Sequence, residues 1–164
     1  MSPSTKHKKS DTELLYEKIK GIKVAMMTTV EPDGTLCSRP MATQDAKDIK
    51  EDGNLWFFTQ ASAPKVGQVE QHHQVNLSYA KPDDNLFISV SGTGELVRGR
   101  KRLKDLWRPF YETWFPKGLD DPELALLCIH IDRAEFWSTS KTGLLKGLLT
   151  GHKEQIGEDI KLDV

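Results

Sequence analysis

The chain has 164 residues, which suits one domain with a hydrophobic core and leaves little room for a second. Its 23 lysine and arginine residues nearly balance its 24 aspartate and glutamate residues, so no overall field draws it to nucleic acid or to an anionic membrane, and any anion site must be local. No apolar run approaches the roughly 20 residues of a membrane span and no signal peptide opens the chain, which favours a cytoplasmic protein.

Three helices are predicted along the chain. Residues 1–10 are polar and basic and are expected to form a disordered tail. The first helix follows from Asp11 or Thr12, because apolar residues then recur at helical spacing up to about Gly21. The other two are expected at 64–72, which opens with a proline, and at 103–111.

The rest of the domain consists mostly of apolar and β-branched segments joined by turns. Gly92 and Gly94 interrupt the longest of these segments, where we expect a bulge or a sharp bend. Strands joined mainly by turns favour an antiparallel β-barrel with peripheral helices, so we predict a mainly β domain over 11–140 and a C-terminal extension over 141–164. The predicted strands span residues 23–30, 35–42, 54–60, 74–80, 86–98, 123–132 and 134–138.

One short stretch predicts a binding site. A strand ends at Thr59, a polar turn carries Ser62, and a helix begins at Pro64 and Lys65. A hydroxyl, a cation and free amides at a helix start together suit a phosphate monoester. Lys65 alone would equally suit a solvated surface lysine, and Arg39 on an earlier strand would equally suit an ion pair with Asp45 or Glu51.

The remaining reactive side chains predict no metal site and no catalytic residue. Cys37 and Cys128 lie in separate apolar segments, so we expect buried thiols. His72 and His73 are adjacent at a helix end and would not share a face as metal ligands do, and His130 is expected to be a partly exposed strand residue. Since no Ser, His and Asp set or carboxylate pair stands out, any chemistry would belong to a cofactor.

An ordered set of motifs resembles one family. SRPM at 38–41, LWFFT at 55–59, Lys65, VNLSY at 75–79 and AEFW at 134–137 resemble the pyridoxamine 5'-phosphate oxidase-like FMN-binding split barrels. The segments WRPFYETWFPKG and DDPELALL resemble the general stress protein group within that family.

The resemblance implies a homodimer with FMN at the subunit interface. It implies that Arg39 and Lys65 are the phosphate cations and Thr59 the hydroxyl donor. The backbone of Pro40 and Met41 would lie beside the flavin ring, and Trp137 would reach it from the second subunit. The other residues that the alignment assigns to the cofactor are Phe58 and Ser62.

Two departures from the family pattern shape the functional prediction. Trp137 is followed by STSKTGLLKG and not by the arginine and histidine that hold pyridoxamine phosphate, and Phe87 stands where a polar residue is expected. We therefore predict an FMN-dependent oxidoreductase of the general stress protein type that acts on another small molecule. The alternatives are a flavin-binding stress module without turnover, or a deazaflavin or haem binder on the same barrel. Trp137 by itself would also suit a core aromatic.

Overall fold

The computed structural model describes residues 11–44, 48–138 and 157–161. The tail predicted at 1–10 and most of the extension at 141–164 lie outside these residues. The described helices are α1 (Asp11–Ile19), α2 (Asp48–Asp52), α3 (Pro64–His72) and α4 (Arg100–Leu106), with short 3-10 turns η1 (Pro82–Asp84), η2 (Pro109–Thr113) and η3 (Gly118–Asp120). The described strands are β1 (Val24–Val30), β2 (Leu36–Ala42), β3 (Asn54–Gln60), β4 (Gln74–Lys81), β5 (Leu86–Val97), β6 (Leu124–Ser138) and β7 (Gly157–Lys161).

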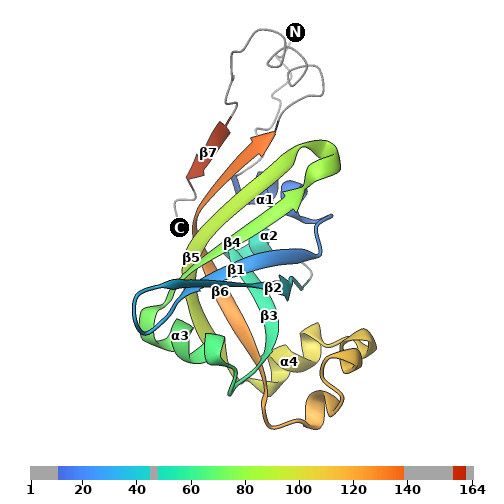
Figure 1. The fold of residues 1–164 in the computed structure, drawn as a ribbon. Helices are drawn as coiled ribbons and strands as arrows, with labels where there is room; N and C mark the ends of the chain where they lie inside the picture. The colour runs from blue at the N-terminus through green and yellow to red at the C-terminus, as the bar shows by residue number, and fades with distance from the viewer. Residues whose placement is uncertain (1–10, 45–47, 139–156, 162–164) are drawn as a thin grey trace, which may run out of the picture.

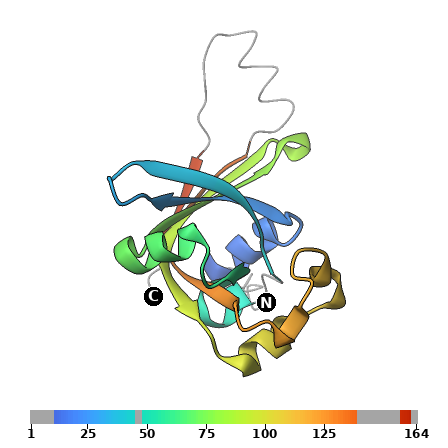
Figure 2. The ribbon, with the colours of Figure 1, turned by 60° about the horizontal axis from the view of Figure 1, so that its bottom comes forward.

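The strands form one antiparallel sheet in the order β2-β1-β4-β5-β6-β3, and β7 pairs with the far end of β6. The sheet curls, as Figures 1 and 2 show, so that its two edge strands approach each other. They meet where Gln44 N donates a hydrogen bond to Trp56 O over 3.1 Å. The result is a split barrel, which confirms the predicted fold class.

The main core fills the inside of this barrel. Alternate residues of β1, β4 and β5 point inward, including the fully buried Met27, Leu77 and Val90. Helix α1 adds Leu15 and Ile19 to the same core. A fully buried side chain of this size contributes about 1.5 to 3 kcal/mol, so the core accounts for most of the driving force.

A second apolar cluster covers the outer face of β3 and β6. Leu103 and Leu106 of α4 pack there with Phe58 and Leu126, and the aromatic residues of the η2 segment close over them. Strand β6 is therefore buried on both faces from Leu124 to Ile129. This arrangement brings the segment after α4 next to the end of β3.

The bulge predicted in the longest strand is present. Ser91 pairs with Arg133 and Gly92 with Ile131, which leaves Asp132 without a partner in the ladder. A Cβ at Gly92 would lie 2.1 Å from the carbonyl oxygen of His130, so only glycine allows the two strands to approach this closely.

Four details differ from the prediction. The segments 123–132 and 134–138 form one strand, β6, because the bulge accommodates the polar residues between them. The helix expected at 103–111 ends at Leu106, since Arg108 before Pro109 is extended. Helix α2 and strand β7 were not expected. Among the described residues, no helix is both long and apolar enough to cross a membrane.

Candidate functional site

A cavity of about 380 Å³ opens between the two edge strands. Strand β2 contributes Pro40 and Met41 to its lining, and β3 contributes Phe58 and Thr59. Lys65, in the first turn of α3, lines it as well. Five of the residues predicted to bind the cofactor therefore share one cavity.

Arg39 does not itself line this cavity, but it directly precedes the lining residue Pro40 on β2. Two buried polar side chains hold its guanidinium group. Its Nη1 donates to Thr29 Oγ1 over 2.6 Å and its Nη2 donates to Gln68 Oε1 over 3.0 Å. Thr29 Oγ1 in turn donates to Gln68 Oε1 over 2.5 Å. Both partners are neutral, and among the described residues no carboxylate forms an ion pair with Arg39. Asp45, one of the two acids considered as its partner, lies outside those residues.

Lys65 carries a second positive charge close to Arg39. Burial lowers the pKa of Lys65, and the positive charge of Arg39 lowers it further. Within the described part of the chain, Lys65 has no carboxylate in ion-pair contact. Two cations that repel each other beside a cavity form a site that an anion would stabilise. The alternative of a fully solvated Lys65 does not describe this partly buried side chain.

The turn before α3 is fixed by Glu123, the residue just before β6. Ala61 N donates to Glu123 O over 2.7 Å, and Ser62 N donates to Glu123 Oε2 over 3.2 Å. Residue Ala63 is the N-cap of α3 and supplies no side-chain cap. Ser62 is exposed and does not line the cavity, although it belongs to the turn that positions Lys65.

Thr59 and Phe58 end β3 in different surroundings. Thr59 is 1% exposed, and its hydroxyl donates only a long hydrogen bond of 3.3 Å to Gln60 O. Phe58 packs against Tyr111 and Phe115 at ring centroid distances of 5.0 and 6.2 Å. The end of β3 thus places the Thr59 hydroxyl beside a group of aromatic side chains.

The aromatic wall was not assigned to the site from the sequence. Tyr111, Trp114 and Phe115 all line the cavity, and Tyr111 and Phe115 pack with Phe58 of β3. The density of aromatic residues in WRPFYETWFPKG was the available signal for them.

Trp137 lies elsewhere in the single chain. It is near the end of β6 remote from the cavity, opposite Phe87 on β5, and the two side chains are 36% and 46% exposed. The expected contact between Trp137 and the cofactor requires a second subunit, so it stays a prediction.

Comparison with known proteins identifies relatives over most of the chain. The sequence profile of the family described as "Pyridoxamine 5'-phosphate oxidase like" matches residues 10–160. Protein bli-3 of Neurospora crassa is 25% identical over 144 residues, which cover 79% of this chain and 68% of that protein.

Solved structures of similar fold include the following two. A Clostridium acetobutylicum protein related to general stress protein 26 superimposes with a TM-score of 0.69 at 19% identity, covering 93% of this chain and 94% of its own. The general stress FMN/FAD binding protein of Xanthomonas citri superimposes with a TM-score of 0.65 at 27% identity, covering 79% and 89% of the two chains.

Proposed function

Because the chain belongs to the pyridoxamine 5'-phosphate oxidase-like family, we propose that the cavity between β2 and β3 binds FMN. The single observation that carries the proposal is the pairing of Arg39 with Lys65 beside that cavity. The relative from Xanthomonas citri is described as an FMN/FAD binding protein, which supports a flavin as the ligand.

The two cations suit the phosphate end of the cofactor. A phosphate monoester carries up to two negative charges, and an arginine can bind two of its oxygens at once. The hydrogen bonds of Arg39 to Thr29 and Gln68 orient its guanidinium group before a ligand arrives. Lys65 adds its side-chain charge, and its backbone N–H has no acceptor among the described residues.

The remaining walls suit the flavin ring. Met41 and the aromatic rings of Tyr111, Trp114 and Phe115 provide apolar surface. The cavity volume of about 380 Å³ lies within the range typical of ligand sites. One side is open in the single chain, and we propose that a second subunit of a homodimer covers it and contributes Trp137.

Two-electron redox chemistry on a small organic molecule would come from the bound flavin. The chain's own residues would hold the phosphate, orient the ring and exclude water from one of its faces. No side chain of the cavity need act as a base.

The test is binding of FMN to the purified full-length protein. We expect flavin absorption bands in the purified protein, or saturable uptake of one FMN per chain after the flavin has been removed. Deazaflavin and haem serve as competing ligands in the same titration. Preferential uptake of either, or no uptake of FMN, would contradict the proposal.

A flavin-binding module without turnover is the second candidate. It is favoured by the sequence STSKTGLLKG after Trp137, which lacks the arginine and histidine that hold a phosphorylated vitamin. Oxidation of NADH or NADPH by the FMN-loaded protein, measured against free FMN at the same concentration, separates the two candidates. A rate above that of free FMN would favour the oxidoreductase.

A further inference from the structure

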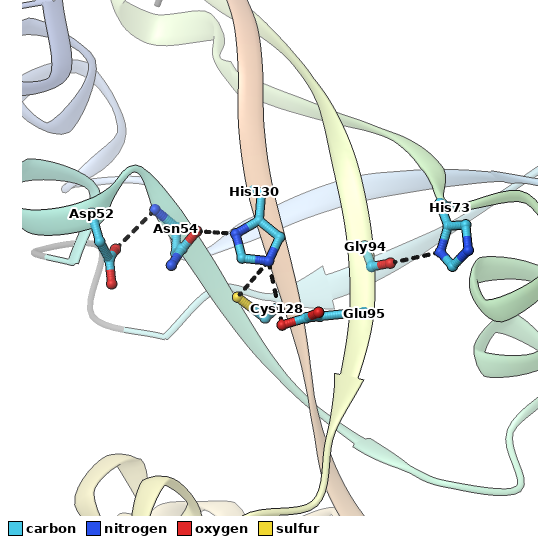
Figure 3. Close-up of polar contacts among 7 residues, drawn as sticks. All are labelled: Asp52, Asn54, His73, Gly94, Glu95, Cys128 and His130. Carbon is cyan, nitrogen blue, oxygen red and sulfur yellow. Dashed lines mark hydrogen bonds and ion pairs between the residues drawn. The ribbon is translucent and has the colours of Figure 1, made fainter. Parts of the chain in front are cut away.

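A second polar cluster lies on the outer face of the sheet, across three neighbouring strands (Figure 3). Cys128 and His130 are two residues apart on β6 and so point to the same face. Glu95 on β5 pairs directly with Cys128, and Asn54 on β3 pairs with His130. None of these residues lines the cavity described above.

Three of these side chains direct different donor atoms toward one point. His130 Nε2 lies 3.3 Å from Glu95 Oε1 and 4.0 Å from Cys128 Sγ. All three donor atoms lie within 4.8 Å of one another. Ligands of a tetrahedral zinc ion, bound at about 2.0 to 2.3 Å, are separated by roughly 3.3 to 3.6 Å. The cluster therefore needs only small side-chain movements to surround an ion.

Asn54 orients the histidine ring for this role. His130 Nδ1 lies 2.6 Å from Asn54 Oδ1, an oxygen that can only accept, so Nδ1 is the nitrogen that donates. The lone pair of Nε2 is then available on the side of Cys128 and Glu95. The backbone of Asn54 is held in turn, because its N donates to Asp52 Oδ1 over 3.1 Å. Histidine ligands of metals are commonly held by such a hydrogen bond from the other ring nitrogen.

We propose that Cys128, His130 and Glu95 form a binding site for a divalent transition-metal ion, with zinc as the best fit. Thiolate and imidazole favour zinc over magnesium and calcium, which prefer oxygen ligands. The thiol would lose its proton when the ion binds.

The burial of the three ligands indicates what kind of metal site this is. Cys128 is 1% exposed and lies at the base of the cluster, whereas the side chains of His130 and Glu95 are 47% and 59% exposed. The ion would be held on the protein side by sulfur and would face solvent on the other side. Three protein ligands with a fourth position open to water are typical of zinc sites that exchange a ligand.

The site could not be read from cysteine spacing. Its ligands lie on two strands and are brought together by the register that pairs Glu95 with Cys128. That register is shifted by the bulge at Gly92, three residues before Glu95. Without that one-residue shift, the glutamate would face a different residue of β6.

Cobalt provides a direct test on the full-length protein, prepared without a histidine tag and stripped with a chelator. Titration with CoCl₂ is expected to reach one ion per chain and to produce the near-ultraviolet charge-transfer band of a cobalt-thiolate bond. ZnCl₂ should then displace the cobalt and remove the band. Cys128→Ser should abolish the band, and Asn54→Ala should weaken zinc binding about 10- to 100-fold by releasing the ring.

Variants of the two exposed ligands and of the other cysteine serve as controls for this test. His130→Gln and Glu95→Gln change exposed side chains and should fold normally, so loss of binding in them does not depend on the buried thiol. Cys37→Ser, on strand β2, which pairs with neither β5 nor β6, should leave the band unchanged. A band that persists in Cys128→Ser, or equal zinc affinity in His130→Gln, would mean an adventitious ion only. FMN titration of the same variants should be unaffected, so failure of the metal proposal leaves the flavin proposal intact.

Discussion

Replacing Lys65 with methionine tests the phosphate site most directly. The change keeps most of the length and the apolar stem of the side chain and removes one charge that is partly buried beside Arg39. A hydrogen bond to a charged group contributes about 1.5 to 3 kcal/mol, so FMN should bind about 12- to 140-fold more weakly. The upper part of this range is expected, because the ligand also relieves the repulsion between the two cations.

Riboflavin, which has the same ring without the phosphate, is the matched ligand for this experiment. Its affinity for Lys65→Met should equal its affinity for the unchanged protein, as measured by quenching of flavin fluorescence. Lys101→Met, on the exposed face of α4, is the matched control and should bind both ligands normally. Equal loss for FMN and riboflavin, or no loss for FMN, would refute the assignment of Lys65 to the phosphate.

The lowered pKa of Lys65 gives the same variant a second signature. Without FMN, the unfolded chain binds the Lys65 proton more tightly than the folded chain does, so the charged lysine destabilises the folded protein. The free energy of unfolding therefore rises as pH increases through the lowered pKa of Lys65. Without FMN, Lys65→Met should therefore melt at a higher temperature than the unchanged protein at neutral pH. FMN affinity should fall as pH rises through the same range, and riboflavin affinity should not.

Three further outcomes are expected from the structure. Gly92→Ala should lower the free energy of unfolding, measured by urea denaturation, by about 1 to 3 kcal/mol, because its Cβ would lie 2.1 Å from the carbonyl oxygen of His130. The control Gly21→Ala, with nothing within 4 Å of its Cβ, should change the urea midpoint little. Trp114→Ala should weaken FMN and riboflavin by the same factor, since an aromatic wall contacts the ring and not the phosphate, and a loss confined to FMN would contradict this role. Sedimentation should show a homodimer, and Trp137→Ala should reduce FMN affinity in it; a monomer with full affinity would exclude the shared site.

The sequence was sufficient for most of the strands and for one side of the cavity. A short apolar run between polar residues located β3 at its observed bounds, and the proline at residue 64 did the same for α3, because both signals are local. The same local signals brought Thr59 and Lys65 into one site. Arg39 joined them only through the family resemblance, since its contacts with Thr29 and Gln68 span 10 and 29 residues of sequence.

The features that the sequence missed depend on contacts between distant segments. The polar pair Asp132 and Arg133 looked like the end of a strand, and only the partner strand with its bulge at Gly92 allows β6 to continue through it. Tyr111 reaches the cavity because α4 folds back over β3, and no periodicity in the sequence predicts that path. The cluster of Cys128, His130 and Glu95 likewise depends on register between strands.

The hydrogen bond from Gln44 to Trp56 lies at a seam where the two border strands of the sheet have no ladder between them. Strand β2 supplies one lip of the cavity and β3 the other. A ligand bound there would contact both edge strands and link them. A bound ligand would then make the whole barrel more rigid. Without the ligand, β2 and β3 would be able to move apart at this seam.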